Sequence, residues 1–400
     1  MSSNPTDAFT LCPRLGQSDG HGQPLVTPLV LSTTYCRDDI DADVAHAYSR
    51  ESNPTVAALE HALGQLEDAP DAACFATGLA AETALFLTLL KQGDHVACSR
   101  ACYGGTTRLL EQVLSGLGVQ VDFVDTSDLD AVAAVLRPNT RLLLAETPAN
   151  PTLLLSDLRA LADLAHANGT LLAVDNTFLT PALQQPLELG ADVSVTSTTK
   201  FIEGHSAALG GALVTRDEDL LDRIRFVRKC TGAIQSPLGA WLTLQGLKTL
   251  PLRLQRQSET AGAIATWLAQ REDVELVHYP GLPDFPQAAL ARRQHRGAHG
   301  AVVSFEPKGG ATRARELVRQ LKLARLVEHV GSVETLVTHS ASMTHGGVRP
   351  EEREAVGVTD GLLRLSIGLE PAETLIADLE QALAFSRVAT EGGASCPAVA

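Results

Sequence analysis

Residues 192–206 read DVSVTSTTKFIEGHS, which places one lysine, Lys200, between hydroxyl side chains and a glycine-containing tail. The alternating pattern of residues 192–196 predicts a β-strand, so Lys200 follows the end of a strand. Open α/β sheets bind their ligands outside the carboxyl ends of their strands. A lone lysine is most often a solvated surface cation. A lysine at this position can instead be a nucleophile in a binding site, and the two alternatives are separated by whether the other parts of such a site are present.

Short apolar runs alternate with helical patterns on both sides of this stretch. Helices are predicted at residues 54–64, 79–90 and 158–167, and further strands at residues 72–76, 95–98, 119–124, 141–145, 171–174 and 210–214. Strands that alternate with helices are typical of a doubly wound fold with a mostly parallel sheet. The sequence therefore predicts an α/β large domain.

The pattern changes after a long helical tract at residues 236–268. Pro251 should break or kink this tract, and we place a domain boundary near residue 245. Beyond it, strands at residues 274–277, 300–305, 336–337 and 362–367 and helices at residues 311–321 and 372–389 predict a smaller α+β domain. The expected organisation is an N-terminal arm (1–50) that packs on something else, a large domain (51–245) and a C-terminal domain (246–400) whose last residues, 390–400, form a loose tail.

Composition limits the classes of partner. The chain has 400 residues, a net charge of -15 and an isoelectric point near 5.2, which argues against nucleic acid or an anionic membrane as a partner. Its seven cysteines form no CxxC pair, so they indicate reduced thiols in a cytoplasmic protein and no metal site. The start, MSSNP, does not resemble a signal peptide, and no apolar run reaches the roughly 18 residues of a membrane span.

Asp175 ends the apolar strand predicted at residues 171–174. A buried carboxylate costs free energy unless it pairs with a cation, although Asp175 alone is equally well explained as a turn or helix-cap residue. Lys200 follows the end of the next strand along the chain. Pyridoxal 5′-phosphate (PLP) needs two protein groups of these kinds, a carboxylate for its pyridinium nitrogen and an amine for its aldehyde. The pair therefore points to PLP.

A phosphate site is expected where residues 77–81 (TGLAA) join a short strand to a helix. This stretch offers backbone N–H groups and a helix N-terminus that would face an anion. Ser197 and Thr199 can add hydroxyl donors beside Lys200. Small residues before a helix are common, so this pattern carries little weight without the neighbouring lysine and aspartate.

Three further side chains suit a cofactor. Tyr48 and Arg50 lie in the proline-rich N-terminal segment and offer a phenol and a guanidinium, although a single exposed arginine is commonly only solvated. Tyr103 follows a strand in a glycine-flanked loop. Its ring either stacks on a ligand or packs in the core.

Together these motifs resemble the Cys/Met-metabolism family of PLP-dependent enzymes, which includes cystathionine γ-lyase, cystathionine γ-synthase and methionine γ-lyase. The resemblance runs in order from about residue 20 to residue 390. It rests on YSRESNPT (48–55), TGLAA (77–81), YGGT (103–106), ETPANP (146–151), VDNTF (174–178), STTK (197–200), GHS (204–206), SMTH (342–345) and RLSIGLE (364–370).

The resemblance implies a fold-type-I enzyme in which Lys200 bonds covalently to the PLP aldehyde. Asp175 would keep the pyridine nitrogen protonated, and Tyr103 would stack on the ring. The implied phosphate ligands are the backbone of Gly78 and Leu79, the hydroxyls of Ser197 and Thr199, and Tyr48 and Arg50 from a neighbouring subunit. Ligands from a second subunit make a dimer obligatory, and most relatives pair two dimers into a tetramer.

The resemblance also implies a substrate site. Arg364 would bind the α-carboxylate of an amino acid through a bidentate contact that lysine cannot reproduce, and Asn150 would lie near the cofactor. Lys200 would move protons at the substrate, with Tyr103 as a second acid or base. The implied reaction is γ-elimination on cystathionine to cysteine, 2-oxobutanoate and ammonia. The alternatives are cystathionine γ-synthase, which joins an O-acyl-homoserine to cysteine, and methionine γ-lyase.

Peripheral residues favour cystathionine over methionine. Methionine γ-lyases usually have a cysteine where this chain has Gly105, and Arg108 and Glu328 match positions that face the distal end of cystathionine in its lyases and synthases. His329 replaces a serine usual in relatives, and either a satisfied loop histidine or a substrate contact explains it. Ala207 replaces the aspartate of the usual GHSD motif, so substrate scope stays open.

The sequence can also be interpreted as one of two other classes of protein. A catalytically idle relative would serve as a binding or assembly protein, and it would lack the visible absorbance that PLP acquires on Lys200. A nicotinamide-dependent dehydrogenase on a similar sheet is disfavoured, because no GxGxxG motif opens a βα unit.

Overall fold

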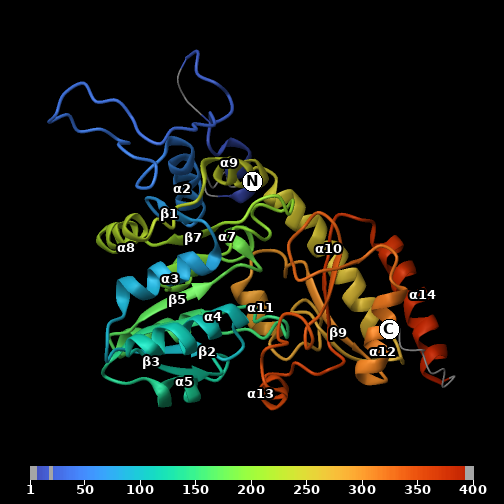
Figure 1. The fold of residues 1–400 in the computed structure, drawn as a ribbon. Coiled ribbons are helices and arrows are strands. Elements are labelled where there is room, and N and C mark those ends of the chain that lie inside the picture. Colours follow the sequence, from blue (N-terminus) through green and yellow to red (C-terminus); the bar gives the residue numbers. More distant parts are fainter. Residues whose placement is uncertain (1–6, 18–20, 392–400) are drawn as a thin grey trace, which may run out of the picture. The chain divides into compact units, whose positions relative to one another are not determined.

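The computed structural model describes residues 7–17 and 21–391, and the chain forms two compact units (Figure 1). The first unit comprises Met1–Pro148 and Leu155–Leu252, and the second comprises Ala149–Leu154 and Arg253–Ala400. The N-terminal MSSNP segment and most of the expected C-terminal tail lie outside the described residues.

A seven-stranded sheet forms the centre of the first unit. Its strands are β1 (Ala72–Phe75), β2 (His95–Ser99), β3 (Gln120–Val124), β4 (Thr140–Glu146), β5 (Leu171–Asp175), β6 (Val193–Thr196) and β7 (Gly211–Val214), in the order β1-β7-β6-β5-β4-β2-β3. The neighbours from β3 to β6 are parallel, whereas β7 is antiparallel to both β6 and β1. The predicted mostly parallel α/β sheet is confirmed.

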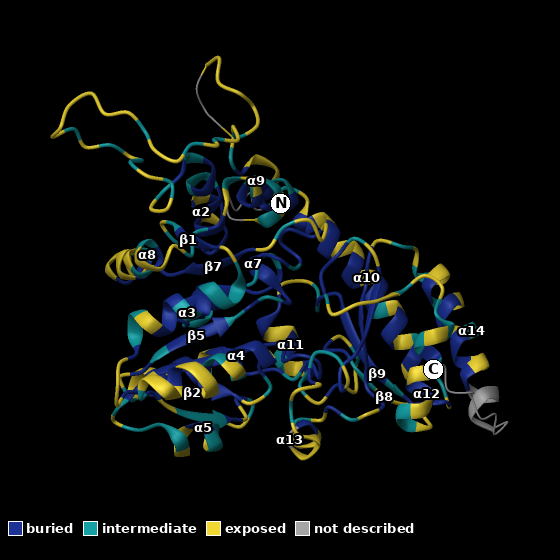
Figure 2. Ribbon diagram, in the orientation of Figure 1, coloured by how far each residue is buried: buried dark blue, intermediate teal, exposed yellow. Residues whose placement is uncertain are grey.

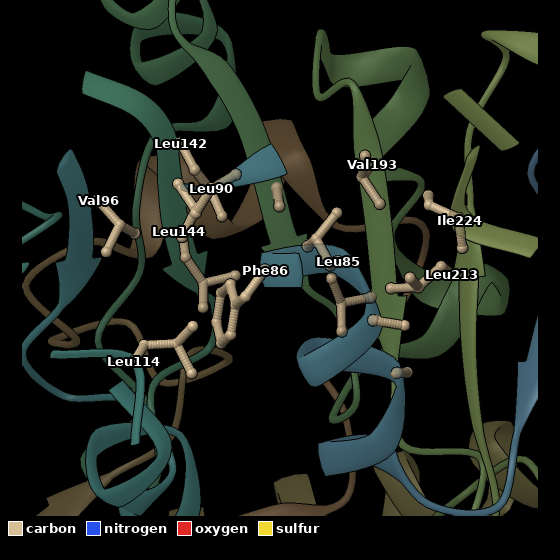
Figure 3. Close-up of a cluster of buried hydrophobic side chains, with 14 of the residues drawn as sticks. Leu85, Phe86, Leu90, Val96, Leu114, Leu142, Leu144, Val193, Leu213 and Ile224 are labelled. Carbon is tan, nitrogen blue, oxygen red and sulfur yellow. The ribbon is translucent and has the colours of Figure 1, made fainter. Parts of the chain in front are cut away.

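Two apolar cores cover the opposite faces of this sheet. Successive strand residues point to opposite faces, and accordingly Leu142 and Leu144 join one cluster while Leu143 joins the other. The first cluster also contains Leu85 and Phe86 of helix α3 (Gly78–Leu89), which Figure 3 shows beside these strand residues. The buried faces explain why the strands read as continuous apolar runs.

Several helices of the first unit begin where a polar side chain caps them. Thr77 caps α3 by accepting a hydrogen bond from the N–H of Ala80. The other helices of this unit are α1 (Ala8–Leu11), α2 (Pro54–Leu66), α4 (Gly104–Arg108), α5 (Leu129–Val135), α6 (Leu158–Ala167), α7 (Thr180–Leu183), α8 (Glu218–Thr231) and α9 (Pro237–Leu247). The next helix, α10 (Leu250–Ala269), has Pro251 in its first turn, so the predicted interruption of the helical tract is confirmed.

The second unit has a mostly antiparallel five-stranded sheet. Its strands are β8 (Val274–His278), β9 (Val302–Pro307), β10 (Arg325–Leu326), β11 (Leu336–His339) and β12 (Leu363–Ser366), in the order β10-β11-β12-β9-β8. The helices α11 (Ala288–Gln294), α12 (Gly310–Gln320), α13 (Pro350–Ala355) and α14 (Ala372–Glu391) accompany it. One apolar cluster joins the sheet to α10, α12 and α14. This arrangement confirms the predicted smaller α+β part.

The N-terminal segment differs from the rest of the first unit in its exposure. Residues 21–46 are largely exposed and extended (Figure 2), and apolar side chains such as Leu31 and Ile40 lie in solvent, Ile40 at 90% exposure. Thr34 forms one isolated β-bridge with Tyr48, and no other β-bridge involves the described residues 21–46.

Within residues 7–17 and 21–391, no helix is both long and apolar enough to cross a membrane. The same residues contain no group of three or more His, Cys, Asp or Glu side chains placed so that they could hold a metal ion, and their six cysteines are free.

Candidate active site

One edge of the large sheet gathers the polar residues that the sequence singled out. Strands β2, β4, β5 and β6 are parallel, and β1 runs in the same direction because β7 is antiparallel to both β1 and β6. The segments that leave these strands therefore emerge at a common edge. They carry Gly78, Tyr103, Glu146, Asp175 and Lys200. The prediction that Lys200 follows a strand end is confirmed.

Gly78 and Ser197 form a small cradle at the N-terminus of α3. A Cβ atom on Gly78 would lie 3.0 Å from Cβ and 3.2 Å from Oγ of Ser197, so the missing side chain allows this close approach. A Cβ atom on Gly211, at the start of β7, would collide with the backbone of Thr77 and Gly78. The first-turn N–H groups of a helix have no intrahelical partner. The cradle therefore places hydrogen-bond donors beside a serine hydroxyl, which suits an anion.

Thr177 connects Asp175 to this cradle, a role that the sequence analysis missed. The N–H of Thr177 donates to Oδ1 of Asp175 at 2.9 Å, and its hydroxyl oxygen accepts from the N–H of Ser197 at 2.8 Å. Burial raises the pKa of Asp175, and a hydrogen bond from the hydroxyl of Thr177 to the Asp175 carboxylate opposes part of this rise. Thr177 lies within the VDNTF motif, so its position was visible in the sequence although its contacts were not.

Three carboxyl groups lie together at this edge. Glu146 stands opposite Asp175 in the register of β4 and β5, and Glu82 projects from α3. Burial, followed by the charge of Asp175, raises the pKa of both glutamates well above its usual value. Burial also raises the pKa of Asp175. None of the three forms an ion pair with a described residue, so the cluster has room for one positive charge from a ligand.

Lys200 lies half-buried in a turn that its neighbours hold. Its N–H donates to the carbonyl of Ser197 at 3.3 Å, and its carbonyl accepts from the N–H of Gly204 at 2.8 Å. Thr199 donates its hydroxyl hydrogen to the carbonyl of Gly210 and accepts from the N–H of Gly210, both at 3.0 Å. The hydroxyl of Thr199 thus fixes the lysine loop against the start of β7, and its role as a phosphate ligand stays a prediction.

Tyr103 precedes helix α4, and its side chain is 42% exposed. Its N–H donates to Oε2 of Glu146 at 2.7 Å, which fixes the backbone from which the ring projects. A Cβ atom on Gly105 would collide with the ring of Tyr103 and lie 3.0 Å from Cδ1 of Leu79. The ring therefore occupies space that any larger residue at position 105 would need. Arg108, at the end of α4, is exposed.

The structure does not bring Tyr48 and Arg50 to this cradle. The guanidinium of Arg50 lies 5.3 Å from the ring centre of Tyr48, and its Nη1 donates to the carbonyl of Lys229 at 2.6 Å. Their predicted role from a neighbouring subunit stays a prediction.

The second unit holds the predicted carboxylate-binding residue in a prepared position. Arg364, on β12, is only 2% exposed. Its Nη1 donates to Oδ1 of Asn150 at 2.7 Å, and its Nη2 donates to the carbonyl of His329 at 3.0 Å and to the hydroxyl of Thr338 at 3.1 Å. Asn150 thus orients Arg364. Its expected place near the cofactor stays a prediction. Glu328, next to His329, is exposed.

His345 of the SMTH motif contacts the same group. Its side chain is buried and hydrogen-bonds the backbone of Asn150, and its Nδ1 lies 3.0 Å from the hydroxyl of Thr344. Burial, together with the charges of Arg364 and Arg353, lowers the pKa of His345 to about 4. His345 is therefore neutral near pH 7. The motif was visible in the sequence, but this role was not.

Comparison with known proteins identifies the family. Residues 10–384 match the profile of the family described as Cys/Met metabolism PLP-dependent enzyme. The chain belongs to this family. An O-succinylhomoserine sulfhydrylase of Pseudomonas aeruginosa is 42% identical over 386 residues, which cover 94% of each chain.

Two solved structures of related enzymes share the fold. A cystathionine gamma synthase from Xanthomonas oryzae pv. oryzae, in complex with aminoacrylate and cysteine, superposes with a TM-score of 0.92 at 39% identity and covers 95% of this chain and 98% of its own. A cystathionine gamma-lyase from Lactobacillus plantarum, complexed with L-serine, gives a TM-score of 0.92 at 36% identity and covers 95% and 99%. The predicted family and fold class are therefore confirmed.

As a member of the Cys/Met metabolism PLP-dependent enzymes, the chain uses PLP, and the residues of the first unit fit that cofactor. The acid cluster around Asp175 contains no cation from the described residues, so a protonated pyridine nitrogen would supply the missing positive charge. The cradle of Gly78 and Ser197 suits a phosphate. Lys200 would supply the amine that the aldehyde requires.

Proposed function

We propose that this enzyme cleaves cystathionine to cysteine, 2-oxobutanoate and ammonia by PLP-dependent γ-elimination. The choice of substrate rests on Arg108 and Glu328, which match positions that face the distal end of cystathionine in its lyases and synthases. Each side chain is exposed within its own unit, and neither forms an ion pair with a described residue. Opposite charges suit the carboxylate and ammonium at the distal end of cystathionine. Methionine ends in an uncharged thioether and gains nothing from them.

Arg364 recognises the amino acid that reacts. Its planar guanidinium binds the α-carboxylate through two parallel hydrogen bonds. Asn150 and Thr338 hold it in one orientation before the substrate arrives, which reduces the entropy lost on binding. Neutral His345 supports Asn150 without adding a competing charge.

Lys200 and Tyr103 move the protons. Bound PLP supplies an electron sink for negative charge that develops at the substrate Cα. The Nζ atom of Lys200 would take the proton from Cα and deliver it to the C4′ carbon of the cofactor, which leaves the amine free to take a proton from Cβ. The hydroxyl of Tyr103 would donate a proton to the sulfur that leaves. The half-buried position of Lys200 restricts water around its amine.

The remaining predicted residues hold the cofactor. Asp175, supported by Thr177, keeps the pyridine nitrogen protonated, and Tyr103 stacks on the ring. The phosphate is bound by three sets of groups. They are the backbone N–H groups of Gly78 and Leu79, the hydroxyls of Ser197 and Thr199, and the side chains of Tyr48 and Arg50 from a second copy of the chain.

The enzyme is proposed to work as a cytoplasmic homo-oligomer. The exposed apolar side chains of residues 21–46, Ile40 among them, support burial of this segment against a second copy. The free cysteines of the described residues support a reducing compartment. Light scattering of the purified protein tests for a tetramer, and a monomer at micromolar concentration contradicts this part of the proposal.

Cystathionine γ-synthase is the second candidate, because relatives at similar identity carry that name and the name of a sulfhydrylase. A product assay separates them. Release of 2-oxobutanoate and cysteine from cystathionine supports the lyase. Activity only with an O-acyl-homoserine and cysteine overturns it in favour of the synthase, and faster release of 2-oxobutanoate from methionine than from cystathionine points to a methionine γ-lyase.

A further inference from the structure

Glu82 is a buried acid that the proposed mechanism does not use. It lies one turn into α3, and its side chain is 5% exposed. The hydroxyl of Thr106 donates to both carboxyl oxygens of Glu82, at 3.0 Å and 2.8 Å. A buried carboxyl group costs free energy unless it is hydrogen-bonded. This hydrogen bond therefore offsets part of the free energy that burial of the Glu82 carboxyl group costs.

The bond joins two elements that have separate tasks at the site. Glu82 belongs to the helix whose first residues, Gly78 and Leu79, form the cradle. Thr106 belongs to α4, a helix of five residues that begins directly after Tyr103. Because α4 opens with two glycines, it has few side chains of its own with which to pack. α4 runs on directly into the helical turns of Leu109–Leu114, whose Leu110 and Leu114 pack in the apolar core. The bond between Glu82 and Thr106 therefore acts on the first turn of α4, next to Tyr103.

Tyr103 is consequently held from both sides by buried carboxyl groups. Glu146 accepts from the N–H of Tyr103 itself, and Glu82 accepts from Thr106, three residues later. The two contacts fix the position of the residue and the direction in which the chain leaves it.

Glu82 belongs to a cluster of acidic groups. Glu82 faces Asp175 of β5 and Cys102 of the loop before α4, and Glu146 of β4 completes the cluster. Burial, and then the negative charge of Asp175, raises the pKa of Glu82 well above its usual value. The hydrogen bond from Thr106 acts in the opposite direction, so it favours the carboxylate at this position.

We propose that Glu82 and Thr106 are a positioning pair that fixes Tyr103 relative to the first turn of α3 and so sets how tightly the PLP ring is held. The inference rests on the proposed roles of Tyr103 and Gly78 in cofactor binding. Neither Glu82 nor Thr106 touches substrate or cofactor in this scheme. Both act through the placement of α4.

Matched substitutions separate the hydrogen bond from the charge and the volume. Glu82→Gln keeps the acceptor and the length without a titratable group, whereas Glu82→Leu removes the acceptor. Thr106→Ser keeps the donor, whereas Thr106→Val removes it at nearly constant volume. The four single variants and the Glu82→Leu/Thr106→Val double variant are compared in three measurements: the Kd for PLP, the circular dichroism of the bound cofactor, and the thermal midpoint of the apoprotein.

The proposal predicts a weakening of PLP binding of about fivefold to tenfold in Glu82→Leu and in Thr106→Val, as expected for one net hydrogen bond. The same variants change the circular dichroism of the cofactor band, because the ring on which Tyr103 stacks is reoriented. Glu82→Gln and Thr106→Ser stay close to the wild type. The double variant is no weaker than the single ones, since both remove the same contact.

Several results overturn the proposal. The first is a Thr106→Val variant whose Kd for PLP and circular dichroism equal those of the wild type, even if Glu82→Leu fails to fold. The second is a double variant in which the losses of PLP affinity add. The third is a Glu82→Gln variant that binds PLP as weakly as Glu82→Leu. These outcomes differ from a failure of the proposed function. In that case the wild type gains no visible absorbance with PLP, or the Lys200→Ala variant shows the same absorbance as the wild type.

Discussion

The side chain of Asn150 accepts a hydrogen bond of 2.7 Å from Nη1 of Arg364, 214 residues later in the chain. Nη2 of the same guanidinium is held by Thr338 and by the carbonyl of His329. The arginine is therefore oriented before any ligand arrives.

Replacing Arg364 with lysine is expected to weaken recognition of the substrate carboxylate. Lysine keeps the charge but loses the planar pair of donors, so KM for cystathionine should rise by about tenfold to a hundredfold. Asn150→Ala should cause a smaller rise, because Thr338 still holds the guanidinium. Steady-state kinetics on both variants measure this. An unchanged KM in Arg364→Lys contradicts the assignment of the carboxylate site.

His345 should make the second unit sensitive to acid. Its pKa is about 4 in the folded state, because of burial and two arginines, against about 6.5 in an unfolded chain. The stability that a neutral His345 contributes is fully present above pH 6.5 and is lost as pH falls toward 4, by on the order of 2–3 kcal/mol. Urea denaturation from pH 4 to pH 8 should show a shallower acid loss in His345→Gln. Equal slopes in the two proteins refute the role.

Thr177→Val should uncouple Asp175 from the cradle. The change leaves the N–H of Ser197 without its acceptor, which costs about 1 kcal/mol in a half-buried position. It also removes a hydrogen bond that lowers the pKa of Asp175. We expect weaker PLP binding, measured by equilibrium titration, and a lower unfolding midpoint. Thr177→Ser is the control and should restore both, and its failure to do so means that the hydroxyl is not the cause.

Gly105→Cys should displace the ring of Tyr103, because a Cβ atom at position 105 collides with it. Cystathionine cleavage is expected to fall more than methionine cleavage, so the ratio of kcat/KM for methionine to that for cystathionine rises. Gly105→Ala separates bulk from thiol chemistry and should shift the ratio in the same direction. Wild-type ratios in both variants mean that residue 105 does not control the choice of substrate.

The sequence predicted the strands and the edge of the sheet because each carries a local signal. Buried parallel strands read as short apolar runs, and polar residues such as Asp175 and Lys200 follow directly where those runs end. The charged helix α8 was not anticipated, although Asp217 before it and Gly232 after it are ordinary cap residues. The two exposed residues of β10 carry too little pattern to be recognised as a strand.

The contacts that hold the candidate site could not be predicted from neighbouring residues in the sequence. Thr177 and Thr106 lie within motifs and Glu82 lies in a predicted helix, but no local pattern shows which residues they contact. Their partners depend on how α3, α4 and β5 pack, and packing is decided by residues far along the chain. His345 was visible as part of a motif, but its hydrogen bond to Asn150 spans almost two hundred positions.

The long-range pairings also impose an order on the enzyme's assembly during synthesis. The cradle needs Gly78, Ser197 and Gly211, so a growing chain offers no phosphate site until about its middle has left the ribosome. Asn150 is made early but finds Arg364 only when the chain is nearly complete. The cradle can therefore be complete in a nascent polypeptide well before the contact between Asn150 and Arg364 can form.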